Sequence, residues 1–142
     1  MKVLLDTNIL ISASGSIEGT PYKAFFKAIS TPNKGVVCDQ NIEEMRRVFI
    51  RKFPNKLDLL EKFFTFALME LEVIHASAIP VEEEGRIRDP ADRTILRAAI
   101  AAKVDIIVTG DKDFLDSGIT KPQIMTAADF LRLAARKGSN PR

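Results

Sequence analysis

The stretch Lys2-Val3-Leu4-Leu5-Asp6 decides the fold class, because a short apolar run ends abruptly at a carboxylate. A second stretch, Asp105-Ile106-Ile107-Val108-Thr109-Gly110-Asp111, follows the same plan near the other end of the chain. Short continuous apolar runs are typical of strands buried on both faces of a parallel sheet. Either aspartate alone could be only a turn former or cap. Because ligands bind at the carboxyl ends of parallel strands, both aspartates are expected to point into one crevice.

Strand and helix patterns alternate along the rest of the chain. Further short strands are predicted at residues 34–38, 73–74 and 123–125. The main helices are predicted at residues 20–29, 41–52, 57–71, 89–102 and 127–137. This alternation predicts a three-layer α/β/α sandwich around a central, mainly parallel sheet. One domain is expected over residues 1–136, followed by a flexible polar tail at residues 137–142.

Some local features follow from residue type and spacing. Thr7 or Asn8 is expected to cap the first helix, and Thr20 the second. The aromatic and aliphatic residues of the second helix are expected to face inward: Tyr22, Phe25, Phe26 and Ile29. The run Glu82-Glu83-Glu84 is expected to be solvated surface.

Two more acids, Glu44 and Asp92, lie near the starts of predicted amphipathic helices. Carboxylates gathered at one place repel each other and raise each other's pKa, so a cluster makes sense if a divalent cation lies among them. A metal held in this way can activate a bound water and neutralise charge on a phosphate. These residues therefore indicate a metal-dependent nuclease. The alternatives stay open: Glu44 beside Glu43 could be one solvated acid on a helix face, and Asp89 and Asp92 could be helix caps.

Composition excludes several other classes of function. The net charge of +2 and the pI of about 8.8 are compatible with a polyanionic partner and equally with simple solubility. Cys38 and His75 are the only residues of their types, which argues against disulfides, Ser/His or Cys/His catalysis and zinc sites. No signal segment, membrane span, P-loop or dinucleotide motif is apparent, so a cytoplasmic protein without a membrane association or a nucleotide cofactor is expected.

Acid-rich α/β enzymes of other kinds fit less well. Haloacid dehalogenase phosphatases need Asp-x-Asp after the first strand, whereas Asn8 occupies the third position here. Receiver domains need paired acids at the first strand end, and these are missing.

Four segments together resemble the motifs of PIN domains, in the order of that family. They are Met1 to Leu10 with Asp6-Thr7-Asn8, Glu44 to Phe49, Asp92 to Ala99, and Val108 to Phe114 with Thr109-Gly110-Asp111-Lys112-Asp113-Phe114. Any one of these motifs is weak evidence, but the set spans most of the chain. The resemblance implies cleavage of single-stranded RNA by a water that Mg²⁺ or Mn²⁺ activates.

The resemblance also assigns roles to residues. Asp6, Glu44, Asp92 and Asp111 match the acidic quartet of the family, and they are the expected catalytic residues and metal ligands. Asn8 and Thr109 match polar supporting positions. Asp113 is expected to bind a second metal or to orient its loop, and Asp89 is an extra acid of the subgroup with Asp-Pro-x-Asp.

That subgroup is similar to VapC toxins, which implies a cognate antitoxin and a homodimer. The helices 20–29 and 57–71 carry more apolar residues than one core face needs. These residues could form a surface shared with a second copy, or both helices could be buried within the monomer. Arg46, Arg47, Arg51, Lys52 and Arg93 could hold RNA phosphates or be plain helix surface. The alternative function is a catalytically inactive module whose acidic groove binds RNA or a basic partner segment.

Overall fold

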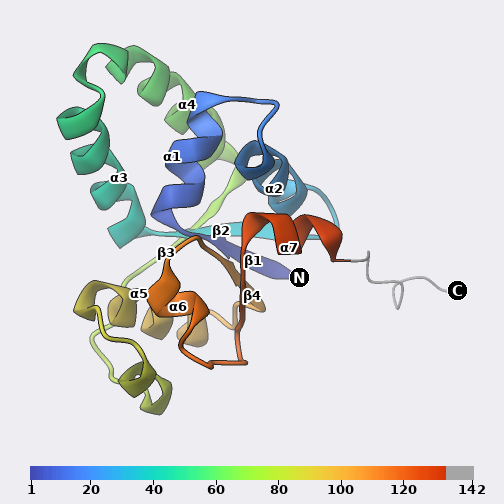
Figure 1. The fold of residues 1–142 in the computed structure, drawn as a ribbon, viewed down its shortest axis with the longest axis vertical. Coiled ribbons are helices and arrows are strands. Elements are labelled where there is room, and N and C mark those ends of the chain that lie inside the picture. The colour runs from blue at the N-terminus through green and yellow to red at the C-terminus, as the bar shows by residue number, and fades with distance from the viewer. Residues whose placement is uncertain (134–142) are drawn as a thin grey trace, which may run out of the picture.

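A parallel sheet of five strands organises the computed structural model, which describes residues 1–133 (Figure 1). The sheet order is β3-β2-β1-β4-β5, and every neighbouring pair is parallel. The strands are β1 (Lys2–Leu5), β2 (Lys34–Cys38), β3 (Glu72–Ile74), β4 (Ile106–Val108) and β5 (Gln123–Met125). From β1 the chain adds β2 and β3 on one side of the sheet, and it then returns to the other side of β1 to add β4 and β5. The gap between β1 and β4 is therefore a topological switch point, where α/β proteins bind ligands.

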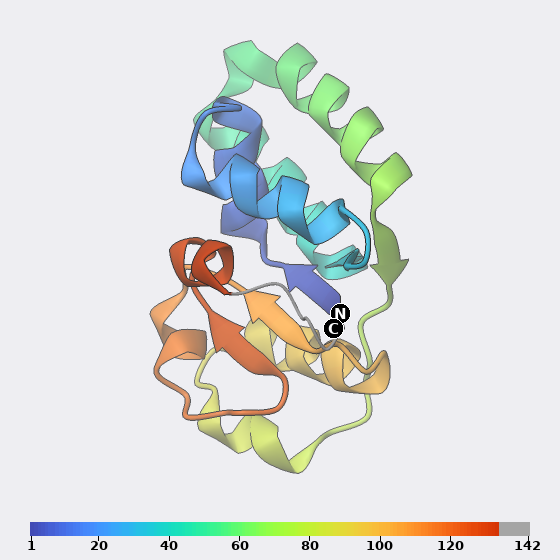
Figure 2. The same cartoon turned by 90° about the vertical axis from the view of Figure 1, so that its right-hand side faces the viewer.

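Helices cover both faces of this sheet (Figures 1 and 2). One core contains Leu5 and Val108 from the strands, and helices α1 (Thr7–Gly15), α2 (Thr20–Ile29), α3 (Asp39–Lys52), α4 (Leu57–Glu70) and α7 (Ala127–Arg132) pack over it. The other core contains Leu4 and Ile107, packed against α5 (Pro90–Ala101) and α6 (Lys112–Leu115). Alternate strand residues thus point to opposite cores, as a doubly covered sheet requires. The predicted three-layer fold is confirmed.

Two 3-10 helices, η1 (Pro54–Lys56) and η2 (Glu82–Arg86), complete the described elements. None of the helices within residues 1–133 has the length and apolar character needed to cross a membrane. The end of the last predicted helix, residues 134–137, and the predicted tail lie outside the described residues.

Several local predictions were wrong: two concerned helix caps, and two concerned side chains whose surroundings depend on tertiary packing. Asp6 itself is the N-cap of α1, accepting from the Thr7 amide at 2.8 Å, and α2 begins after Gly19 with no side-chain cap. Phe26 is 57% exposed, because Ala24, Phe25 and Ala28 supply the buried face of α2. Glu84 is not free solvated surface, since its carboxylate accepts two hydrogen bonds from Arg97, at 2.6 and 2.9 Å.

Candidate metal centre

Four acids from four elements meet at the carboxyl edge of the sheet. Asp6 follows β1 and Asp111 follows β4, and these strands are neighbours whose last residues, Leu5 and Val108, pair directly. The Asp6 amide continues the pairing by donating to the Val108 carbonyl at 3.0 Å. Glu44 comes from α3, and Asp92 from the first turn of α5. The expected convergence of these carboxylates is therefore present, although their catalytic roles remain a prediction.

Asp6 is buried and held by three donors. Its Oδ1 accepts from the Thr7 amide at 2.8 Å and from Asn41 Nδ2 at 3.1 Å, and its Oδ2 accepts from Thr109 Oγ1 at 2.6 Å. Burial raises the pKa of Asp6, and the charges of Glu44 and Asp111 add to that rise, while the bonds from Thr109 and Thr7 oppose it. The carboxylate is thus fixed in orientation but costly to ionise.

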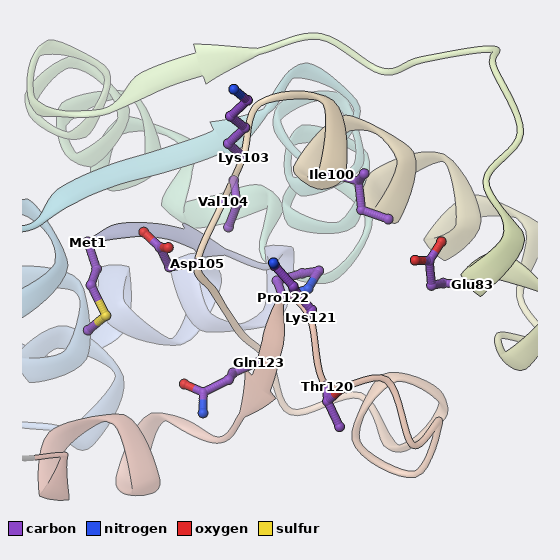
Figure 3. A pocket seen from close by; sticks show the side chains of 10 residues that line it. All are labelled: Met1, Glu83, Ile100, Lys103, Val104, Asp105, Thr120, Lys121, Pro122 and Gln123. Carbon is purple, nitrogen blue, oxygen red and sulfur yellow. The ribbon is translucent and has the colours of Figure 1, made fainter.

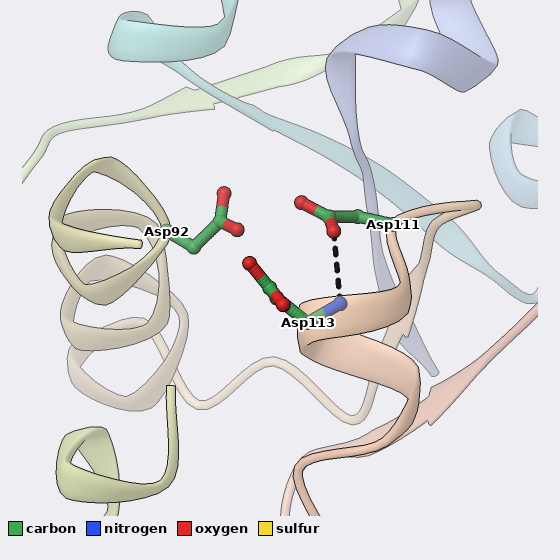
Figure 4. Close-up of side chains that lie close together, drawn as sticks. All are labelled: Asp92, Asp111 and Asp113. Atoms are coloured by element: carbon green, nitrogen blue, oxygen red, sulfur yellow. Dashed lines mark hydrogen bonds between the residues drawn. The ribbon is translucent and has the colours of Figure 1, made fainter. Parts of the chain in front are cut away.

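Asp92, Asp111 and Asp113 form the tightest group of acids at this edge (Figure 4). One oxygen from each lies within 4.8 Å of the other two, and the Asp113 amide donates to Asp111 Oδ1 at 2.9 Å. Burial, followed by the neighbouring Asp111 carboxyl, raises the pKa of Asp92 to about 9, and the charges of Asp6 and Asp89 contribute. Asp92 Oδ2 is buried and has no hydrogen-bond partner among the described residues.

This donor set fits a hard divalent cation. All the ligand atoms are carboxylate oxygens, the type that Mg²⁺ and Mn²⁺ prefer. An unpaired buried oxygen is rare in native proteins, and a cation beside Asp92 Oδ2 would provide its missing partner. The same cation would offset the repulsion that raises the pKa of Asp92.

Glu44 joins the cluster through a hydroxyl. Thr7 Oγ1 donates to Glu44 Oε1 at 3.1 Å, and the same Thr7 oxygen accepts from Asn41 Nδ2 at 2.9 Å. Asn41 thereby contacts both Asp6 and the partner of Glu44. Sequence reasoning missed Asn41 because it placed the start of the helix there. Because α3 starts at Asp39, Asn41 is inside the helix. It lies three residues before Glu44 and therefore on the same side of the helix.

The other predicted supporting residues divide into two groups. Thr109 contacts Asp6 directly, and Asp113 belongs to the tight group of acids. Asn8 is exposed, and its side chain makes no hydrogen bond within the described part of the chain. Asp89 is the N-cap of α5, accepting from the Ala91 amide at 3.0 Å, so capping explains it without a metal.

Of the basic residues that could hold phosphates or be plain helix surface, Arg46, Arg47, Arg51 and Lys52 are exposed on α3. Arg93 donates through Nε to the Ile87 carbonyl at 2.6 Å, and Arg46 lies over the Phe64 ring at 5.4 Å. Arg88, which the sequence did not single out, pairs with Asp113 at 2.8 Å and is otherwise exposed. Within residues 1–133, it is the one arginine or lysine in an ion pair with this group of acids.

A separate pocket of about 720 Å³ lies away from these acids (Figure 3). Its lining includes Met1, Asp105 and Gln123, which are at the beginnings of β1, β4 and β5. The pocket is therefore at the amino edge of the sheet, opposite the acids. Its charged lining residues, Glu83, Lys103, Asp105 and Lys121, are all exposed, so no buried polar group marks it as a ligand site.

The chain is similar in sequence to one protein family and in structure to two solved proteins. Residues 2–113 match the PIN domain family. No curated protein matches the sequence. Among solved structures, one similar chain is from VapBC2 of Rickettsia felis, bound to a DNA fragment from their promoter. It has a TM-score of 0.62 and 20% identity, and the match covers 89% of this chain and 97% of that one. PAE2754 from Pyrobaculum aerophilum has a TM-score of 0.65 and 18% identity, with 96% and 91% coverage. At these identities the two structures establish the fold.

Proposed function

The chain belongs to the PIN domain family, whose members are generally nucleases, and on that premise we propose that it is a metal-dependent endoribonuclease acting on single-stranded RNA. The observation that carries the proposal is the group Asp92, Asp111 and Asp113, with its unpaired buried oxygen on Asp92. Such a group is unfavourable in a protein that binds no cation, because it buries a polar atom and gathers like charges.

In the proposed mechanism, Asp92, Asp111 and Asp113 would hold Mg²⁺ or Mn²⁺ together with Asp6, whose charge contributes to the raised pKa of Asp92, and Glu44 would line the same crevice. A metal bound there would supply a nucleophilic water and neutralise charge on the scissile phosphate. Asp92 would have to lose its proton to act as a ligand, because its pKa of about 9 keeps the carboxyl protonated at neutral pH. Asp6 keeps a constant orientation through its bonds with Thr7, Asn41 and Thr109.

We further propose that the protein is the toxin of a toxin–antitoxin pair in the cytoplasm, with the nuclease domain spanning residues 1–136. The similarity to a chain of the VapBC2 complex supports a cognate antitoxin as partner. A homodimer is supported by apolar side chains left exposed on neighbouring helices: Phe26 of α2, and Leu59, Phe66 and Met69 of α4. Such side chains on a monomer would leave apolar surface in water.

The test is cleavage of a labelled single-stranded RNA with Mg²⁺, Mn²⁺ or EDTA. We expect cleavage with either metal, none in EDTA, and a loss of at least about 100-fold in Asp111→Asn, because that substitution removes a proposed ligand. Circular dichroism checks that the variant remains folded. RNA binding without cleavage across divalent metals would instead support the inactive binding module.

A further inference from the structure

Asn41 is a fully buried amide whose donors are both committed to the acidic site. Its Nδ2 donates to Asp6 Oδ1 at 3.1 Å and to Thr7 Oγ1 at 2.9 Å. Its Oδ1 is buried and has no hydrogen-bond partner among residues 1–133. An unpaired carbonyl is unfavourable, and an apolar side chain of similar volume would avoid it. The placement of the amide is therefore explained by its two N–H groups and not by core packing.

The bond from Asn41 also decides where the Thr7 proton points. Because Thr7 Oγ1 accepts from Asn41, its own hydrogen is left to donate, and Glu44 Oε1 lies at 3.1 Å. The competing acceptor, the backbone carbonyl of Asn41, is farther away at 3.4 Å. A continuous chain of donors thus joins the carboxylate at the end of β1 to the carboxylate on α3.

We propose that Asn41 is a positioning residue that holds Asp6 directly, and Glu44 through Thr7, in the mutual arrangement needed for divalent-metal binding. This inference rests on the proposed nuclease function, which supplies the metal. The amide places partial positive charge between two carboxylates that would otherwise repel. It does so without a charge of its own, so it does not compete with the cation. Partners of this kind behind metal-site carboxylates commonly change affinity by 10- to 100-fold.

The experiment compares Mn²⁺ affinity, by calorimetric titration, in the wild type and in Asn41→Leu. We expect Mn²⁺ to bind about 10-fold or more weakly to Asn41→Leu, while its unfolding temperature in EDTA stays close to that of the wild type. Met45→Leu is the matched control, because Met45 is buried one turn further along α3 and faces the core. It should keep wild-type affinity. Unchanged Mn²⁺ affinity in folded Asn41→Leu would overturn the proposal.

A second variant and a double-mutant cycle test whether Asn41 acts by positioning the carboxylates or only by packing. Thr7→Val cuts the same link without changing Asn41, and it should also weaken Mn²⁺ binding. In a Glu44→Gln background, Asn41→Leu should weaken binding less than it does alone, because part of its effect passes through Glu44. Equal losses in both backgrounds would refute the Glu44 link.

Cleavage kinetics add a readout of the same link. In Asn41→Leu, kcat should fall by about 10-fold at a fixed subsaturating Mn²⁺ concentration, while KM for RNA should stay within about 2-fold, because Asn41 does not face the substrate. A rise in KM alone would contradict a positioning role. A wild-type protein that bound Mn²⁺ but cleaved no RNA would refute the proposed function, and the Mn²⁺ comparison would still decide the role of Asn41.

Discussion

Asp92→Asn should make the metal-free protein more stable, even though it removes a proposed ligand. The folded cluster raises the pKa of Asp92 from 3.8 to about 9, so the native protein keeps this proton at pH 7 whereas the unfolded chain releases it. When folding raises the pKa of an acid, the protein becomes less stable as pH rises from the pKa of the unfolded state to the pKa of the folded state. Asparagine is neutral in both states, so it escapes this loss.

The size of this gain in unfolding free energy follows from the interval between the ordinary aspartate pKa of 3.8 and pH 7. At about 1.36 kcal/mol for each pH unit, this interval corresponds to at most about 4 kcal/mol. Sharing of protons and relaxation within the cluster reduce that figure, so we expect a gain of about 2 kcal/mol at pH 7. For a domain of this size, that raises the unfolding temperature by roughly 6 °C. The gain should shrink towards zero near pH 4.

The assay is thermal unfolding in EDTA at several values of pH, repeated with Mn²⁺. Asp58→Asn, which removes an exposed acid on α4, is the control and should shift stability by less than about 0.5 kcal/mol. With Mn²⁺, the order should reverse, because only the wild type gains from ligand binding. Lower stability of Asp92→Asn in EDTA at pH 7, or a gain independent of pH, would refute the reasoning.

Three other predictions concern ligand, core and surface positions. Asp6→Asn should remove most Mn²⁺ binding measured by calorimetry, since Asp6 is a proposed ligand; binding equal to that of the wild type would contradict this role. Glu84→Gln should lower stability at neutral pH. Arg97 lowers the pKa of Glu84 to about 2, so the contribution is present above about 4.5 and disappears as pH falls towards 2. Denaturant unfolding should give a larger difference in unfolding free energy between the wild type and Glu84→Gln at pH 7 than at pH 2.5. Equal differences at the two pH values would contradict this prediction. Light scattering at micromolar concentration should report a dimer of the 15.8 kDa chain, and Met69→Lys should favour the monomer; a wild-type monomer would exclude that surface as an interface.

The sequence by itself determined the class of fold and the place of the acids. Apolar runs that end in Asp6 and Asp111 are local patterns, and parallel strands bring their carboxyl ends to one edge whatever the details of packing. The alternation of elements was likewise readable, because periodicity depends on neighbours in the chain.

Only the tertiary structure decided how the acids are held. Asn41 donates to Asp6 across 35 positions of sequence, and Thr109 across 103, so no local pattern reveals either bond. The exposure of Phe26 and the pairing of Glu84 with Arg97 also depend on what packs against each helix. The physical reason is the same in each case: burial, the direction of a hydrogen bond and the pKa of a carboxyl depend on groups that folding brings close from distant parts of the chain.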